Sequence, residues 1–202
     1  MRRLAALAAL ALVVVPLARA DGDPASDYML AVDVFVPFDG KISAARGAQV
    51  TALVAEAKQR GFPLKVALIV TRYDLGSVPS LWLHPHEYAR FLGQEDFFAF
   101  KTRLLVVMPN GYGVSERGKT LARAQALTDK LPKPGTSGDA IAVAAERAVT
   151  KLAAQSGVTL TLPPLRAPAT SSTTNRDRLV ILAAVLGVAG LAGIAYVIRR
   201  LF

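Results

Sequence analysis

The sequence predicts an α/β domain, a three-layer sandwich in which helices cover both faces of a small, mostly parallel sheet. Residues 29–36 and 64–71 are rich in β-branched residues, as strands are, and the apolar spacing between them is that of a helix. Short joints between strand, helix and strand favour a right-handed crossover between parallel strands. A third predicted strand at residues 104–108 gives the sheet at least three strands.

Four helices are predicted from capping residues and apolar spacing. Ser43 can cap the first, over residues 44–60, and Gly61 supplies a stop at its C-terminal end. We expect a polar loop at residues 72–79 and a turn of the chain at residues 110–113. The other three helices cover residues 85–92, 119–130 and 137–155.

The N-terminal end has the pattern of a signal peptide. Arg2 and Arg3 precede an apolar run at residues 4–17 and a small-residue cleavage site. The run is shorter than the roughly 20 residues that span a bilayer, so cleavage is favoured over an uncleaved anchor. The sequence therefore predicts a signal peptide over residues 1–20 and an exported domain over residues 21–162.

The C-terminal end has the pattern of a membrane anchor. Residues 179–198 contain no charged side chain, and as a helix they would cover roughly 30 Å, the thickness of the hydrocarbon core. Arg-rich residues 199–202 then form a cytoplasmic tail. Residues 163–178 carry prolines followed by serines and threonines, a composition typical of a flexible tether. We therefore expect a single-pass protein of the cell membrane with its domain outside the cytoplasm.

The net charge of +9 comes mostly from the two ends of the chain. Five of the 24 basic residues lie in the signal peptide and the tail, which leaves 19 basic against 15 acidic residues elsewhere. The basic residues between the two ends are interleaved with acidic ones, whereas nucleic-acid binding requires a concentrated basic face. We therefore expect no nucleic-acid partner. The absence of cysteine fits either redox compartment.

Polar residues follow each of the three predicted strands, at residues 38–41, 72–74 and 110–112. The carboxyl ends of parallel strands meet at one edge of a sheet, where ligands bind in such folds. Asp39, Asp74 and Asn110 could supply oxygen ligands to Ca²⁺ or Mg²⁺, with Lys41 or Arg72 left to hold an anion. The alternative is that Asp39 and Asn110 are turn residues before glycine and that Asp74 caps a loop.

A second group, His84, His86 and Glu87, admits a metal interpretation, but the chain has only two histidines and no cysteine. A helix that starts at Pro85 is favoured instead. No nucleophile elbow, phosphate loop or dinucleotide fingerprint follows any predicted strand, so we assign no catalytic residue. Trp82 and the later Phe97 either complete the core, which is favoured, or stay exposed for a partner.

One family resemblance is carried by residues 33–41, 55–58, 61–70, 74–76, 88–93 and 104–109. The order of these segments resembles the TPM domain family over residues 29–155. The resemblance implies an α/β sandwich outside the membrane, with proposed roles in membrane-complex assembly or repair, or as a phosphatase that uses a divalent cation. Residues 109–118 are shorter than the hairpin that the family usually carries there.

Two hypotheses of function follow. In the first, the chain is a scaffold or accessory module, anchored in the membrane, that binds other envelope or membrane-complex proteins and needs no cofactor. In the second, it is a phosphatase-like hydrolase that depends on a divalent cation, with Asp39 and Asp74 as Ca²⁺ or Mg²⁺ ligands and Arg72 on the phosphate.

Overall fold

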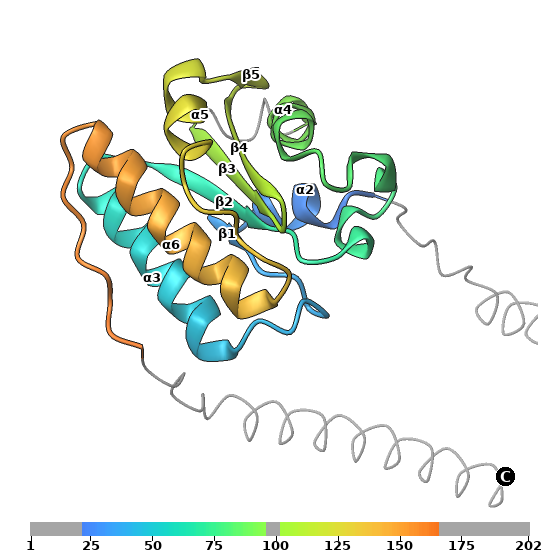
Figure 1. Ribbon diagram of the computed structural model, residues 1–202, viewed down its shortest axis with the longest axis horizontal. Helices are drawn as coiled ribbons and strands as arrows, with labels where there is room; N and C mark the ends of the chain where they lie inside the picture. Colours follow the sequence, from blue (N-terminus) through green and yellow to red (C-terminus); the bar gives the residue numbers. More distant parts are fainter. Residues whose placement is uncertain (1–21, 96–101, 166–202) are drawn as a thin grey trace, which may run out of the picture. The chain divides into compact units, whose positions relative to one another are not determined.

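The computed structural model describes residues 22–95 and 102–165, which form a five-stranded mixed sheet with helices on both faces (Figure 1). The predicted α/β class is confirmed. The strands are β1 (Val34–Phe35), β2 (Leu64–Leu68), β3 (Arg103–Met108), β4 (Gly111–Glu116) and β5 (Lys119–Thr120). The helices are α2 (Pro24–Met29), α3 (Ala44–Gln59), α4 (Pro85–Glu95), α5 (Ala122–Thr128) and α6 (Gly138–Gln155), with 3-10 helices η1 (Arg72–Leu75) and η2 (Pro79–Leu81).

The two predicted targeting segments, residues 1–20 and 179–198, lie outside the described residues, as does most of the predicted tether. Within residues 22–95 and 102–165, no helix is long and apolar enough to cross a membrane.

The strands lie in the order β1-β2-β3-β4-β5. The first three are parallel, as predicted, with Val66 of β2 opposite Val34 and Leu105. β4 and β5 then continue antiparallel, so the sheet is mixed. The sequence prediction placed a turn at residues 110–113, but the turn needs only Pro109 and Asn110, and β4 begins at once. Glycines at alternate positions of β4 conceal its strand pattern from a reading of β-branched residues.

The predicted strand over residues 29–36 shrinks to the two residues of β1. The chain before it forms α2 instead, because Asp23 caps that helix, with its Oδ1 accepting from the Ala25 amide at 3.1 Å, and Pro24 suits the first helical position. This cap accounts for Met29 alone, because residues 30–33 form a turn and an irregular stretch between α2 and β1.

Both long helices begin where the sequence predicts. Ser43 caps α3 through its Oγ, which accepts from the Arg46 amide at 3.4 Å, and Ser137 caps α6 in the same way. The chain leaves α3 through Gly61, whose φ of +83° is a conformation that glycine adopts without strain. α3, α5 and α6 cover one core, whereas α2 and α4 cover the other. Trp82 is half-buried against the second core, so the favoured interpretation holds for it, while Phe97 lies outside the described residues.

α4 packs closely on β4 because Gly113 has no side chain. A Cβ built at Gly113 would lie 1.9 Å from the Pro85 carbonyl oxygen and 2.8 Å from the Ala89 Cβ. Neither backbone can yield without moving the helix away from the sheet. The position of α4, and with it the start of the helix at Pro85, therefore depends on this glycine.

We predict that Gly113→Ala lowers the free energy of unfolding by about 3 kcal/mol, at the upper end of the cost of overpacking. Chemical denaturation would measure the change. Gly47→Ala is the matched control, because Gly47 lies inside α3 and a Cβ there makes only ordinary contact with Val36 at 3.7 Å. That control should stabilise the domain by up to about 1 kcal/mol. Equal effects of the two substitutions would contradict the packing argument.

Candidate functional site

The carboxyl ends of β1 and β2 border one cavity of about 530 Å³. Of the four residues predicted for a site at the strand ends, Asp39 and Asp74 line this cavity, whereas Arg72 and Asn110 do not. Aromatic side chains form much of the remaining wall. The lining residues are Pro24, Tyr28, Phe35, Val36, Pro37, Phe38, Asp39, Thr71, Tyr73 and Asp74.

The Asp74 carboxylate is engaged in the local fold. Its Oδ2 accepts hydrogen bonds from the amides of Val70 and Thr71, each at 2.7 Å, and the residue is only 7% exposed. Thr71 and Asp74 form a capping box at the start of η1. The interpretation that Asp74 caps a loop is therefore confirmed, and its Oδ2 atom is the acceptor in that cap.

Asp39 is exposed on the loop that follows β1. The amide of Gly40 donates to the Pro37 carbonyl at 3.3 Å, so Asp39 lies in a tight turn as the alternative interpretation expected. A side chain at Gly40 would lie 2.9 Å from Val70, and this close approach fixes the loop against β2. Arg72 is exposed at the start of η1.

Asn110 lies at a different place, in the turn between β3 and β4. Its Nδ2 donates to the Leu83 carbonyl at 2.6 Å, and the residue lines a second cavity of about 280 Å³. The three strand ends thus share one edge of the sheet, but their polar side chains do not converge on one point. Among residues 22–95 and 102–165, no group of three or more His, Asp or Glu side chains is placed to hold a metal ion.

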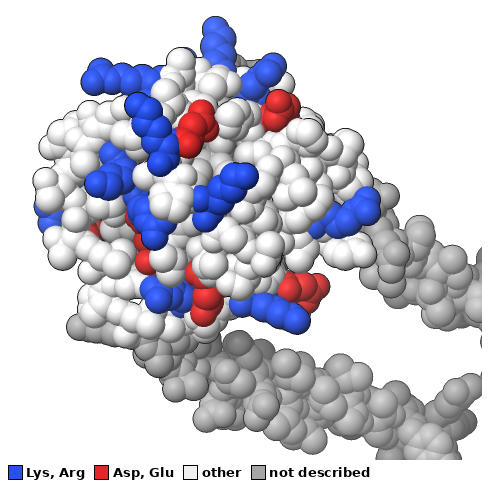
Figure 2. All heavy atoms as spheres, in the orientation of Figure 1, with Lys and Arg blue, Asp and Glu red and all other residues white. Residues whose placement is uncertain are grey.

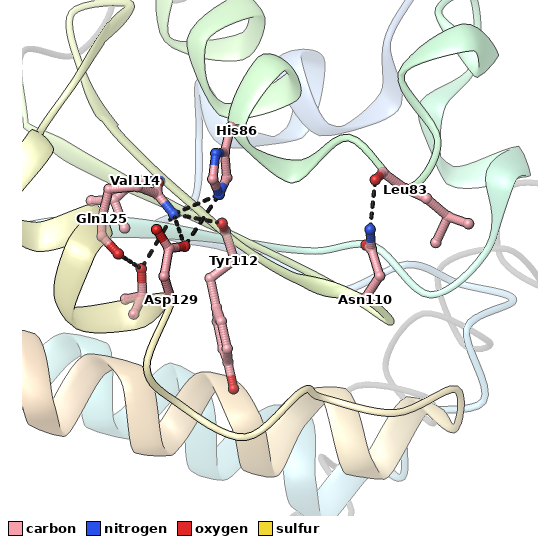
Figure 3. A network of polar contacts seen from close by, with 8 residues as sticks. Leu83, His86, Asn110, Tyr112, Val114, Gln125 and Asp129 are labelled. Carbon is pink, nitrogen blue, oxygen red and sulfur yellow. Dashed lines mark hydrogen bonds and ion pairs between the residues drawn. The ribbon is translucent and has the colours of Figure 1, made fainter.

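The second cavity contains a polar network around Gln125 of α5 (Figure 3). Gln125 Oε1 accepts from the Val114 amide at 2.8 Å, which fixes which end of the amide is the nitrogen. Its Nε2 lies 2.8 Å from His86 Nε2, 2.9 Å from the Tyr112 carbonyl and 2.7 Å from Asp129 Oδ1. His86 Nε2 and Asp129 Oδ1 are 3.3 Å apart.

An amide nitrogen has only two hydrogens for these three neighbours, so the tautomer of His86 decides the arrangement. Without a hydrogen on Nε2, His86 accepts from Gln125, whereas with one it donates to Asp129. The favoured helix start is confirmed here, because Pro85 opens α4 and Glu87 lies in its first turn. Sequence analysis missed Gln125 and Asp129, since they follow His86 by some forty residues and belong to no motif.

Exposed apolar side chains gather around β1. Among the described residues, six of the nine large hydrophobic side chains that stand exposed belong to this region. We call it the β1 surface. It consists of Tyr28, Leu30, Val32, Val36, Phe38 and Tyr73. Sequence analysis missed it because the sequence predicts that residues 29–36 form a strand in a sheet with helices on both faces.

Two buried groups lie outside these cavities. The Tyr88 hydroxyl donates to the carboxylate of Asp23, 2.8 Å from each oxygen, and ties α4 to the cap of α2. Burial, and then the charge of Asp23, raise the pKa of Tyr88 far above its ordinary value. Burial also raises the pKa of Glu146 on α6, although Arg46 of α3, 3.6 Å away, acts in the opposite sense.

Comparison of the chain with models of protein families, with curated proteins and with solved structures found no match. The resemblance to the TPM domain family therefore stays a prediction from the sequence.

We predict that Glu146→Gln reduces the change in the free energy of unfolding with pH, in the window between the unfolded and folded pKa values of Glu146. Because the pKa of folded Glu146 lies above its ordinary value of 4.5, the folded state binds more protons than the unfolded state between the two values. The wild-type free energy of unfolding should therefore fall as the pH rises through this window, relative to that of the variant. Denaturation of both proteins from pH 4 to 8 measures the difference. Parallel profiles would contradict it.

Proposed function

We propose that the chain is a membrane-anchored module outside the cytoplasm that binds other membrane or envelope proteins. The signal-peptide pattern at residues 1–20 and the uncharged run at residues 179–198 support the anchoring. The β1 surface supports the binding, and it is the observation on which the proposal depends.

The β1 surface combines two properties of a protein-binding site. β1 stands at the end of the strand order, and among the described strands it pairs with β2 alone, so its other side is a sheet edge without a strand partner. Leu30, Val32 and Val36 flank that edge and are 61%, 41% and 37% exposed. An unpaired edge beside exposed apolar side chains suits the docking of a partner chain, which can add both main-chain hydrogen bonds and buried area.

We predict that a photo-cross-linking side chain at Val36 captures a defined membrane protein when the full chain is expressed in its native membrane. The same side chain at Lys151, on the exposed face of α6, is the matched control and should not capture it. Leu30→Glu with Val32→Glu should abolish the capture, because a charge on the surface costs desolvation when a partner binds. The same products from Val36 and Lys151, or capture unaffected by the glutamates, would overturn the proposal.

The alternative is a divalent-cation-dependent phosphatase-like hydrolase, which the joint presence of Asp39 and Asp74 in one cavity favours. This alternative predicts that the full chain in detergent binds Ca²⁺ or Mg²⁺ and that Asp39→Ala abolishes the heat of binding in calorimetry. Asp39 is the informative residue because it is exposed, whereas a change at Asp74 would also remove the cap of η1. Equal heats from wild type and Asp39→Ala would exclude this cation site.

A further inference from the structure

The most exposed aromatic residues of the β1 surface lie at the tips of two neighbouring loops. Phe38 is 99% exposed on the loop after β1, and Tyr73 is 84% exposed on the loop after β2. Because β1 and β2 are parallel, both loops leave the sheet at the carboxyl ends of the strands, and both rings line the same cavity. Each tip also carries an exposed basic residue, Lys41 on the first and Arg72 on the second.

Both aromatic rings are exposed on loops whose backbone is held in place by the domain. The turn at Pro37 and Gly40 holds the first loop against Val70, and the capping box of η1 holds the second. Because these loops are fixed, the two rings can be buried from water only when a molecule outside the domain covers them.

The chain leaves the domain at the same end. The Thr161 amide donates to Glu56 near the C-terminal end of α3 at 3.3 Å, and the Gln49 side chain donates to the Pro163 carbonyl near the N-terminal end. Residues 156–165 therefore run antiparallel to α3 (Figure 1). The last described residue, Leu165, comes at the end of the domain where the Phe38 loop enters α3.

We propose that the tips carrying Phe38 and Tyr73 dock into the headgroup region of the lipid bilayer that residues 179–198 are predicted to cross. This inference depends on the anchoring part of the proposed function. The thirteen residues between Leu165 and residue 179 span about 40 Å when extended at about 3.1 Å per residue. The bilayer surface is thus always within reach of this end of the domain, at a high effective concentration.

The chemistry of the tips fits a lipid surface. Aromatic rings favour the boundary between headgroups and acyl chains, where an apolar body and a polar rim are both accommodated. Lys41 and Arg72 can bind lipid phosphates, and Asp39 is the one exposed carboxylate on the two tips. Docking in this orientation brings the unpaired edge of β1 close to the membrane, where the exposed parts of membrane proteins lie.

The contact can be measured by fluorescence, because Trp82 is the only tryptophan of the chain. The full chain with Trp82→Phe and Phe38→Trp would be reconstituted in phosphatidylcholine–phosphatidylglycerol vesicles whose acyl chains are brominated near the headgroups. We expect bromine to quench the tryptophan and its emission to shift to the blue. The control is Trp82→Phe with Lys119→Trp. Lys119 of β5 pairs with Glu116 of β4, which pairs with Arg103 at the amino end of β3, so position 119 lies at the end of the strands away from the two tips. We expect no quenching there.

The possible failures are distinguishable. Resistance to alkaline extraction reports on the anchor independently of fluorescence. An anchored chain whose tryptophan at position 38 is no more quenched than the control would overturn the docking but leave the proposed function standing. The same holds if that tryptophan becomes shielded only when membrane proteins are added, since the tips would then bind protein. Extraction of the chain by alkali would overturn both the anchoring and the docking.

Discussion

The buried ammonium group of Lys65 determines where the sheet ends. From β2 it donates to the carbonyls of Met29 at 2.5 Å and Val32 at 2.7 Å, and it pairs with Asp33 at 3.4 Å. A buried charge needs such partners, so the chain is held in an irregular path from the end of α2 to β1. Burial alone would raise the pKa of Asp33, but the hydrogen bond from Lys58 and the charge of Lys65 outweigh it and lower that pKa. Carbonyls bound to a side chain are not free to extend a strand, and β1 stays short for this reason.

The short β1 has consequences for the surface of the domain. Residues 30–32 pass outside the sheet and expose apolar side chains that a longer strand would have turned toward the cores. Figure 2 shows lysine and arginine side chains over the face on which α3, α5 and α6 lie, with fewer acidic ones among them. The domain thus presents an apolar side around β1 and a charged helical side. Such an asymmetry favours binding through β1 rather than through the outer helices.

The features that the sequence predicts correctly are those encoded over a few residues. Ser43 and Ser137 cap α3 and α6, and the continuous apolar runs of β2 and β3 mark strands that are covered on both faces. The features that it hides depend on contacts between distant segments. β4 is concealed because Gly113 is needed for α4 to approach, not for strand propensity. The Gln125 network joins α4, α5 and β4, and no spacing along the chain reveals it. Asp74 was placed at the correct edge, but its burial in a capping box could be seen only in the fold.

An exposed apolar edge is a hazard for a domain that diffuses freely, because copies can pair through it. Two features of this chain reduce that hazard. Lys65 withdraws two main-chain carbonyls beside β1, so only a short stretch of edge remains to template another strand. The second feature is the proposed docking, in which Phe38 and Tyr73 are covered by lipid and the edge of β1 is held in one orientation above the bilayer. Antiparallel pairing of two β1 edges that point at the membrane would require a two-fold axis in the membrane plane. Two copies that are anchored in one membrane with the same side toward it are related by rotation about the membrane normal instead, so this pairing is hindered. An apolar surface that would be a liability in solution is therefore compatible with a selective binding role at a membrane.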